Sequence, residues 1–171
     1  YEKVAEGGAV VWIVGDSVED GGETLTSFKQ ALYFQALGLK MHDTMIYQKT
    51  EAFVSSTNRY NQSFEYMFVF SKGKLQTHNL IRDRKNLYPN MIQHGTRRQK
   101  DGSLKERISP ITKEFGVRNN IWKYTTGYQK STDQLFAHEH PAIFPDKLAK
   151  DHILSWTNPG DIVLDPFCGS G

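Results

Sequence analysis

The last eleven residues hold the types that could bind a nucleotide-like cofactor. An apolar run, Ile162 to Leu164, leads into Asp165 and then the turn sequence Pro-Phe-Cys-Gly-Ser-Gly. Glycines permit positive φ angles and let a backbone approach a ligand closely. A strand with an acidic residue and a Gly-x-Gly turn is a nucleotide-binding device. Gly169 and Gly171 lack the spacing of the dinucleotide fingerprint, which disfavours a nicotinamide oxidoreductase and leaves a structural turn as the alternative.

A second feature is an excess of positive charge in residues 75–137. This segment has twelve Lys and Arg against five Asp and Glu, whereas the rest of the chain has nine against fourteen. Such a segment is a candidate nucleic-acid surface, and a solvated loop region is the alternative. Its candidate DNA-binding residues are Arg97, Arg98, Lys100, Lys105 and Arg107.

Alternating strand and helix patterns must position these residues, which predicts an α/β fold. The apolar run of residues 7–14 is typical of a strand buried on both faces, as in a parallel sheet. Asp101 and Gly102 predict a tight turn. The other expected elements are helices at residues 25–38 and 145–156 and strands at residues 39–49, 64–73, 119–127 and 162–165.

Two further blocks identify a family. His-Pro-Ala-Ile-Phe-Pro (residues 140–145), followed by a helix and then Asp-Pro-Phe-Cys-Gly-Ser-Gly, resembles the DNA amino-methyltransferases that use S-adenosylmethionine. More narrowly, the order resembles the circularly permuted subgroup, in which the catalytic motif precedes the cofactor motif. The resemblance implies a Rossmann-like methyltransferase sheet, incomplete here, with parallel strands, one antiparallel strand and a basic target-recognition insertion. It divides the chain into methyltransferase core (residues 1–74), recognition region (75–137) and cofactor-binding core (138–171).

The resemblance also implies where the sites lie. It places Phe64 and Tyr66 at the target-base pocket, although core packing is an equal alternative for both. His138, Glu139 and His140 are too weak a cluster to predict a metal. The expected cofactor-binding residues are His140, Pro141, Phe144, Pro145, Asp165, Phe167, Cys168, Gly169, Ser170 and Gly171.

The implied reaction moves a methyl group from S-adenosylmethionine to an exocyclic amine of a flipped base. N4 of cytosine is favoured slightly over N6 of adenine, because residues 15–28 look like relatives that carry the Ser-Pro-Pro-Tyr form of the catalytic motif. No Pro-Pro-Tyr occurs in these 171 residues, and the chain begins at Tyr1 without Met. We therefore expect a fragment that is inactive alone. The alternative is a non-catalytic nucleic-acid-binding α/β module.

The remaining expectations concern partners and compartment. Double-stranded DNA is the expected partner, and a homodimer and a companion restriction endonuclease are compatible with the family. The single cysteine, Cys168, excludes an internal disulfide and fits the reducing cytoplasm. There is no apolar run near about 18 residues, so no membrane helix is expected.

Overall fold

The computed structural model describes residues 2–50, 58–127, 130–132 and 144–168. The chain divides into two compact units. The sheet unit comprises residues 1–79 and 120–171, and the basic unit comprises residues 80–119. The basic unit is shorter than the basic segment of the sequence, because β10 (Ile121–Tyr124) belongs to the sheet unit.

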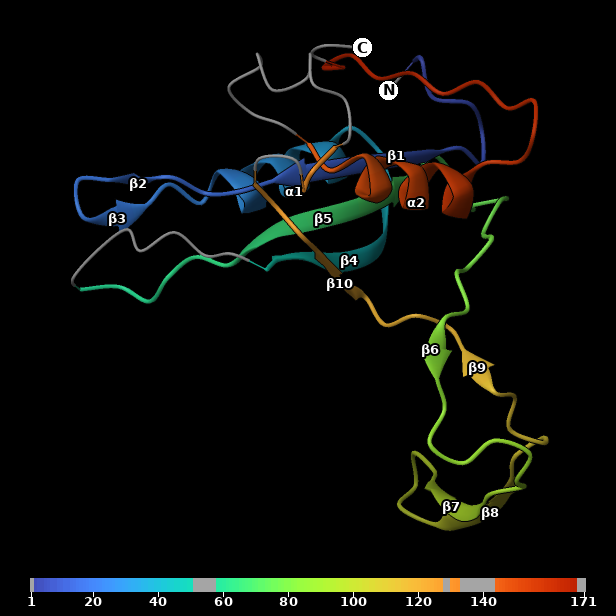
Figure 1. The fold of residues 1–171 in the computed structure, drawn as a ribbon. Coiled ribbons are helices and arrows are strands. Elements are labelled where there is room, and N and C mark those ends of the chain that lie inside the picture. The colour runs from blue at the N-terminus through green and yellow to red at the C-terminus, as the bar shows by residue number, and fades with distance from the viewer. Residues whose placement is uncertain (1, 51–57, 128–129, 133–143, 169–171) are drawn as a thin grey trace. The chain divides into compact units, whose positions relative to one another are not determined.

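A four-stranded sheet with the order β1-β5-β4-β10 forms the centre of the sheet unit (Figure 1). Its strands are β1 (Ala9–Val14), β5 (Phe64–Ser71), β4 (Lys40–Lys49) and β10. β1 and β4 pair antiparallel with β5, and β10 pairs parallel with β4. Three strands therefore run in one direction and β5 in the other, which confirms an α/β fold with a mixed sheet.

The prediction that residues 7–14 form a parallel strand buried on both faces was wrong. β1 pairs with β5 alone among the described strands, in an antiparallel ladder, and all six of its residues are half-buried. The strand lies at the edge of the described sheet, where neighbouring side chains can cover it from one side only. The continuous apolar run signals burial but cannot show where in a sheet a strand lies.

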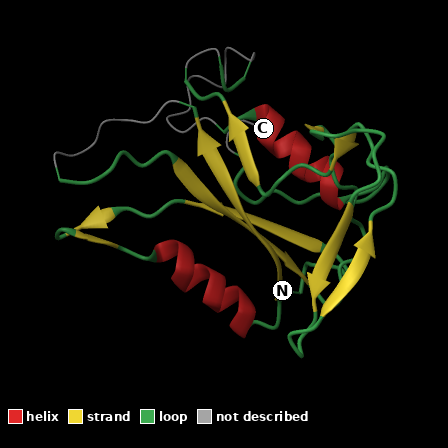
Figure 2. Cartoon of the chain, turned by 90° about the horizontal axis from the view of Figure 1, so that it is seen from below, coloured by secondary structure: helices red, strands yellow, loops and turns green. Residues whose placement is uncertain are grey.

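Helices cover both faces of the sheet (Figure 2). Side chains alternate between the faces of β5. Phe68 and Phe70 form the core with Leu39, and Phe34 of α1 (Thr26–Ala36) packs against it. On the opposite face, Met67 meets His152 of α2 (Asp146–Trp156), with 3.2 Å between Sδ and Nε2.

The ends of α1 are fixed by residues outside it. Asp16 accepts hydrogen bonds from the backbone N–H of Ser27 at 2.9 Å and from its hydroxyl at 2.5 Å. The N-cap itself, Leu25, makes no side-chain cap, so this aspartate from the loop after β1 satisfies a free N–H of the first turn. At the other end Gly38 has φ +94° and donates to Gln35 O, as expected of a C′ glycine.

The predicted strand at residues 162–165 does not form in this structure. No described strand pairs with it, and Ile162 is 96% exposed. Backbone N–H and C=O groups need partners, so an apolar run forms a strand only beside a neighbour. The preceding Asn-Pro-Gly-Asp turn does form, with Asp161 N–H donating to Asn158 O at 3.1 Å.

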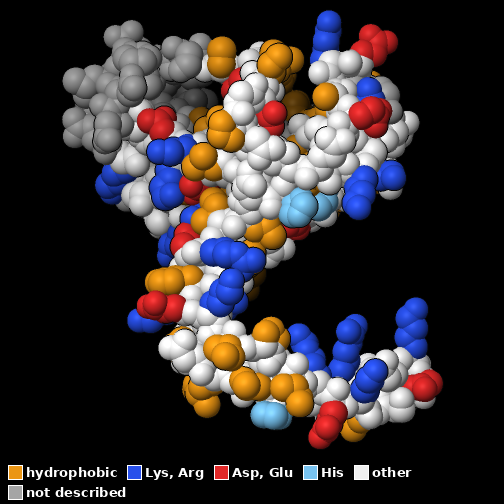
Figure 3. Space-filling view, turned by 90° about the vertical axis from the view of Figure 1, so that its right-hand side faces the viewer, with side chains coloured by type: hydrophobic (Ala, Val, Ile, Leu, Met, Phe, Trp, Pro, Cys, Tyr) orange, Lys and Arg blue, Asp and Glu red, His pale blue; other side chains and the backbone are white. Residues whose placement is uncertain are grey.

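Short antiparallel pairs complete the fold. β2 (Val18–Glu19) pairs with β3 (Gly22–Glu23) in the sheet unit. In the basic unit β6 (Arg84–Lys85) pairs with β9 (Phe115–Gly116), and β7 (His94–Arg98) pairs with β8 (Leu104–Ile108). The Asp101–Gly102 turn between β7 and β8 is confirmed, since Gly102 has φ +86° and Gln99 N–H donates to Ser103 O. In the part of Figure 3 that shows this unit, Lys and Arg side chains project together from one surface.

Candidate functional site

The carboxylate of Asp165 organises the turn that ends the chain. Its Oδ1 accepts a hydrogen bond from the backbone N–H of Phe167 at 2.9 Å, which closes a tight turn around Pro166. Both Asp165 and Cys168 are exposed. The last three predicted cofactor residues, Gly169, Ser170 and Gly171, lie outside the described residues.

The aromatic ring of Phe167 connects this turn to the sheet. It lies 5.9 Å from the ring of Trp12 in an edge-on arrangement, while 74% of its residue surface stays exposed. Trp12 is itself fixed, because its Nε1–H donates to Gln30 Oε1 at 2.8 Å and its ring packs 5.0 Å from that of Phe34. The turn therefore rests on a position that β1 and α1 define.

The two predicted target-base residues belong to the same aromatic cluster. Phe64, Tyr66 and Phe68 follow one another along one face of β5, and the rings of Tyr66 and Phe68 stack at 5.5 Å. Phe68 stands opposite Trp12 in the β1–β5 ladder. Trp12 and Tyr66 both pack against the core cluster that contains the buried Phe68, so Phe167 and Tyr66 are linked through one aromatic cluster. Tyr66 is half-buried and Phe64 is more exposed, so only part of each ring is open to a ligand.

The second predicted cofactor block is described only at its end. His140 and Pro141 lie outside the described residues. Phe144 is exposed, and Pro145 is buried at the N-cap of α2 with φ −67°, one position before the helix. A fixed φ of about −65° suits this entry into a helix. Asp146 N–H donates to Ser131 O at 3.1 Å, which ties the start of α2 to the preceding segment.

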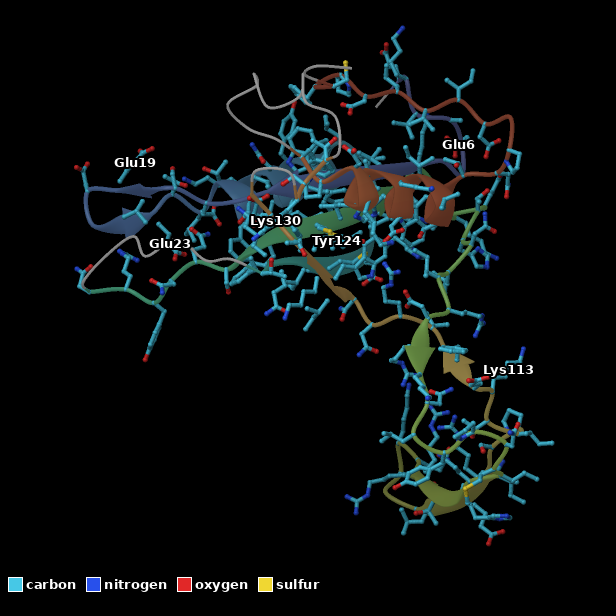
Figure 4. The ribbon with its side chains drawn as sticks, in the orientation of Figure 1. Glu6, Glu19, Glu23, Lys113, Tyr124 and Lys130 are labelled. Carbon is cyan, nitrogen blue, oxygen red and sulfur yellow. The ribbon has the colours of Figure 1, made fainter. Side chains whose placement is uncertain are left out.

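Buried polar side chains on α2 were not predicted from the sequence. Asp151 accepts a hydrogen bond from the hydroxyl of Tyr124 at 2.7 Å and pairs with Lys147 at 3.1 Å (Figure 4 shows Tyr124 on β10). Asp151, His152 and Ser155 are all buried. Their spacing on a helix is a sequence signal for one shared face, but nothing in the sequence identifies their partners.

His152 is held in its neutral form. Trp156 Nε1–H can only donate, and it donates to His152 Nδ1 at 3.1 Å, so the ring proton sits on Nε2. Burial lowers the pKa of His152 to about 4, and the Asp151 carboxylate offsets part of this effect. On β4, burial and, to a smaller extent, the charge of Glu65 raise the pKa of Tyr47 to about 12. These groups are buried in the core.

The basic unit contains two kinds of cations: some bind other groups of the unit, and others are exposed. Arg118 forms a two-pronged ion pair with Asp83, and Arg84 donates to Val117 O at 3.0 Å, so these two hold the unit together. The five predicted DNA-binding residues are all exposed. Among the residues that the structure describes, no hydrogen bond or ion pair involves the side chains of Arg97, Arg98, Lys100, Lys105 or Arg107.

The described ranges contain no group of three or more His, Cys, Asp or Glu side chains placed to share a metal ion. None of the helices in these ranges has the length and apolarity that crossing a bilayer requires.

A mixed sheet covered by helices, an acidic turn after a strand-like run, and a separate basic unit together define an α/β protein with a distinct cationic region. The family model described as DNA methylase, for N6 and N4 methyltransferases, matches residues 1–171. The chain belongs to this DNA methylase family.

Similar proteins carry related names. The orphan methyltransferase M.BamHII of Bacillus amyloliquefaciens is 56% identical over 174 residues, which cover all of this chain and 66% of that protein. The type II methyltransferase M.Cfr9I of Citrobacter freundii is 27% identical over 84% of this chain and 38% of its own length. The DNA adenine methyltransferase YhdJ of Escherichia coli (strain K12) is 43% identical over 32% of this chain and 17% of its own. The chain thus spans less than two thirds of these relatives.

Proposed function

We propose that this chain is part of an enzyme that transfers a methyl group from S-adenosylmethionine to an exocyclic amine of a base in double-stranded DNA. The observation that carries the proposal is the aromatic cluster that links Phe167 to Tyr66 through Trp12 and Phe68. It joins the turn predicted to bind the cofactor to the residues predicted to receive the base. A methyl transfer needs its two ligands held close together, because the reaction is governed by proximity and orientation.

The residues of the turn fit the chemistry of the cofactor. S-adenosylmethionine supplies a methyl group on a positively charged sulfonium. Asp165 offers an exposed carboxylate that attracts this charge and the amino group, while its Oδ1 keeps the turn closed through Phe167 N–H. The exposed ring of Phe167 offers an apolar surface beside it. The predicted contributions of His140, Pro141, Cys168, Gly169, Ser170 and Gly171 remain part of this proposal.

A substitution at Asp165 tests the cofactor site. Asp165→Asn removes the charge but keeps an oxygen that can accept from Phe167 N–H, so we expect S-adenosylmethionine to bind at least about tenfold more weakly, equivalent to about 1.4 kcal/mol. Asp161→Asn is the matched control, since Asp161 accepts from Asn158 N–H in the turn four residues earlier. Calorimetry on both variants measures the effect. Equal affinities for the two would show that Asp165 serves the turn alone.

The base is proposed to be cytosine, modified at N4, with adenine N6 as the second candidate because a relative named as an adenine methyltransferase matches part of the chain. Because these 171 residues contain no Pro-Pro-Tyr, we expect no transfer by this chain alone. The full-length protein, a radiolabelled methyl donor and mass spectrometry of the digested DNA decide the matter. Detection of N4-methylcytosine would support the proposal. Detection of N6-methyladenine would show that the target base is adenine instead of cytosine, and unmethylated DNA would refute the proposal. The formation of a homodimer and the existence of a companion restriction endonuclease remain untested predictions.

A further inference from the structure

The β7–β8 hairpin separates its charged side chains onto two faces. Residues directly opposite each other in an antiparallel pair share a face, and faces alternate along each strand. Gly95 stands opposite Arg107, and Arg97 stands opposite Lys105. We call this surface the cationic face, defined by Arg97, Lys105 and Arg107. The other face carries His94, Thr96, Arg98, Leu104, Glu106 and Ile108.

The acidic residues of the hairpin do not neutralise the cationic face. Glu106 stands opposite Thr96 on the other face, where it shares its surface with Arg98. Asp101 sits in the turn, and its Oδ1 accepts from the hydroxyl of Ser103 at 2.7 Å and from its backbone N–H at 3.0 Å. These bonds, the hydroxyl's first, lower the pKa of Asp101 and keep its carboxylate within the turn. The cationic face thus carries three positive charges and no negative one.

This arrangement is unfavourable for the isolated hairpin. Like charges directly opposite each other in a sheet repel, and Arg97 and Lys105 are such a pair. Every residue of both strands is exposed, so burial in a core does not compensate for the repulsion. Gly95 adds no side chain that would cover Arg107. A polyanion placed against this face would turn the repulsion into attraction.

We infer that the cationic face of the β7–β8 hairpin binds the phosphate backbone of double-stranded DNA, with Arg97, Lys105 and Arg107 each contacting phosphate oxygens. Arg98 is excluded from this contact because it lies on the other face. The choice of duplex DNA as the occupant rests on the proposed function and on charge complementarity. Lysine and arginine contacts to phosphates carry no sequence information, so this face provides affinity and register rather than base recognition.

The experiment compares two triple variants of the full chain that remove the same charge. Arg97→Ala, Lys105→Ala and Arg107→Ala remove the cationic face. Lys85→Ala, Arg98→Ala and Lys113→Ala are the matched control, because these cations are exposed and belong to the same unit. Fluorescence anisotropy with two labelled duplexes of unrelated sequence, over a salt series, measures the slope of log affinity against log salt.

The slope separates direct contacts from general charge. Each phosphate contact contributes about 0.9 to the slope, so the first variant should lose about 2.7 on both duplexes, and the control should keep the slope of the unmodified chain. Equal losses for both variants, or no loss for the first, would overturn the inference. If the first variant loses the same slope with single-stranded RNA, duplex DNA is not the specific occupant of the cationic face.

A second variant guards against a change in folding. Lys105→Glu places opposite charges across the strands, so it stabilises the hairpin while reversing a charge on the cationic face. We expect weaker DNA binding from a better-ordered hairpin, and unchanged or tighter binding would refute the phosphate contact. Methyl transfer is measured separately on the full-length protein. An enzyme without transferase activity that still shows the slope difference refutes only the proposed function, whereas an active enzyme without it refutes only this inference.

Discussion

Strand β5 in the middle of the sheet unit and strand β8 of the basic unit use their side chains in opposite ways. In β5 the residues from Met67 to Ser71 are all buried, because α1 covers one face and α2 the other. In β8 all five residues are exposed: Lys105 and Arg107 lie on one face and Leu104, Glu106 and Ile108 on the other, and none of them is buried. Side-chain packing therefore stabilises the sheet unit, and it contributes comparatively little to the stability of the β7–β8 hairpin.

This contrast explains where cations occur. In the basic unit ten Lys and Arg stand against four Asp and Glu. Only some of them, such as Arg118 with Asp83, hold the fold together. The sheet unit keeps its cations at the surface or in pairs, as with Lys49 and Glu65 at 2.5 Å. Charge that does not serve the fold is available for a ligand, and it is concentrated in the unit that has little core.

The largest expected difference between the units comes from removing an apolar side chain. Phe70 is completely buried between β1, β4 and α1, so Phe70→Ala should lower the free energy of unfolding by about 3–5 kcal/mol. Leu104→Ala, at a position 64% exposed in β8, should change it by less than about 0.5 kcal/mol. Urea unfolding followed by circular dichroism measures both. Similar losses of unfolding free energy in the two variants would show that the hairpin has a packed core, contrary to this prediction.

A smaller effect should appear as a dependence of the sheet unit's stability on pH. The pKa of His152 is about 4 in the folded state and about 6.5 when unfolded, so the unfolded state binds the extra proton first. The stability is therefore full above pH about 6.5 and falls by up to about 3 kcal/mol as the pH drops toward 4. Unfolding measured across this range should show the loss.

Two histidine variants assign this pH dependence. His152→Gln should remove most of it, because glutamine can still accept from Trp156 and does not titrate. His94→Gln, at an exposed position of β7, should leave the profile as it is. If the pH profile of stability changes in the His94 variant but not in the His152 variant, the pH-sensitive group lies in the basic unit, contrary to this prediction.

Much of the fold could be predicted from local sequence. Apolar periodicity located both long helices to within one or two residues, and glycine predicted the end of α1 and the Asp101–Gly102 turn. Long-range partners could not be predicted. The capping of α1 by Asp16, eleven residues from Ser27, and the contacts of Asp151 with Tyr124 depend on how strands and helices meet.

The candidate sites show the same limit. Residue types pointed to Asp165 and the family resemblance implied Phe167, but the contact of Phe167 with Trp12 needs the folded sheet. From the sequence, Arg97, Arg98, Lys100, Lys105 and Arg107 formed a single set of candidates. The strand register instead groups Arg97 with Lys105 and Arg107 and places Arg98 on the opposite face, because adjacent residues of a strand point in opposite directions.

The smallest expected effect is a gain in the stability of the β7–β8 hairpin. Lys105→Glu replaces a repulsive pair with an attractive one opposite Arg97, so β7 and β8 should gain a few tenths of a kcal/mol, up to about 1 kcal/mol. Amide hydrogen exchange should slow in both strands and stay unchanged in β5. Lys113→Glu, outside the β7–β8 ladder, is the control and should slow neither strand. Faster exchange after Lys105→Glu would mean that the two side chains do not share a face. Slower exchange together with weaker DNA binding would show that the charge at this position costs the hairpin stability and contributes to binding, which is the reverse of what a buried residue such as Phe70 does in the sheet.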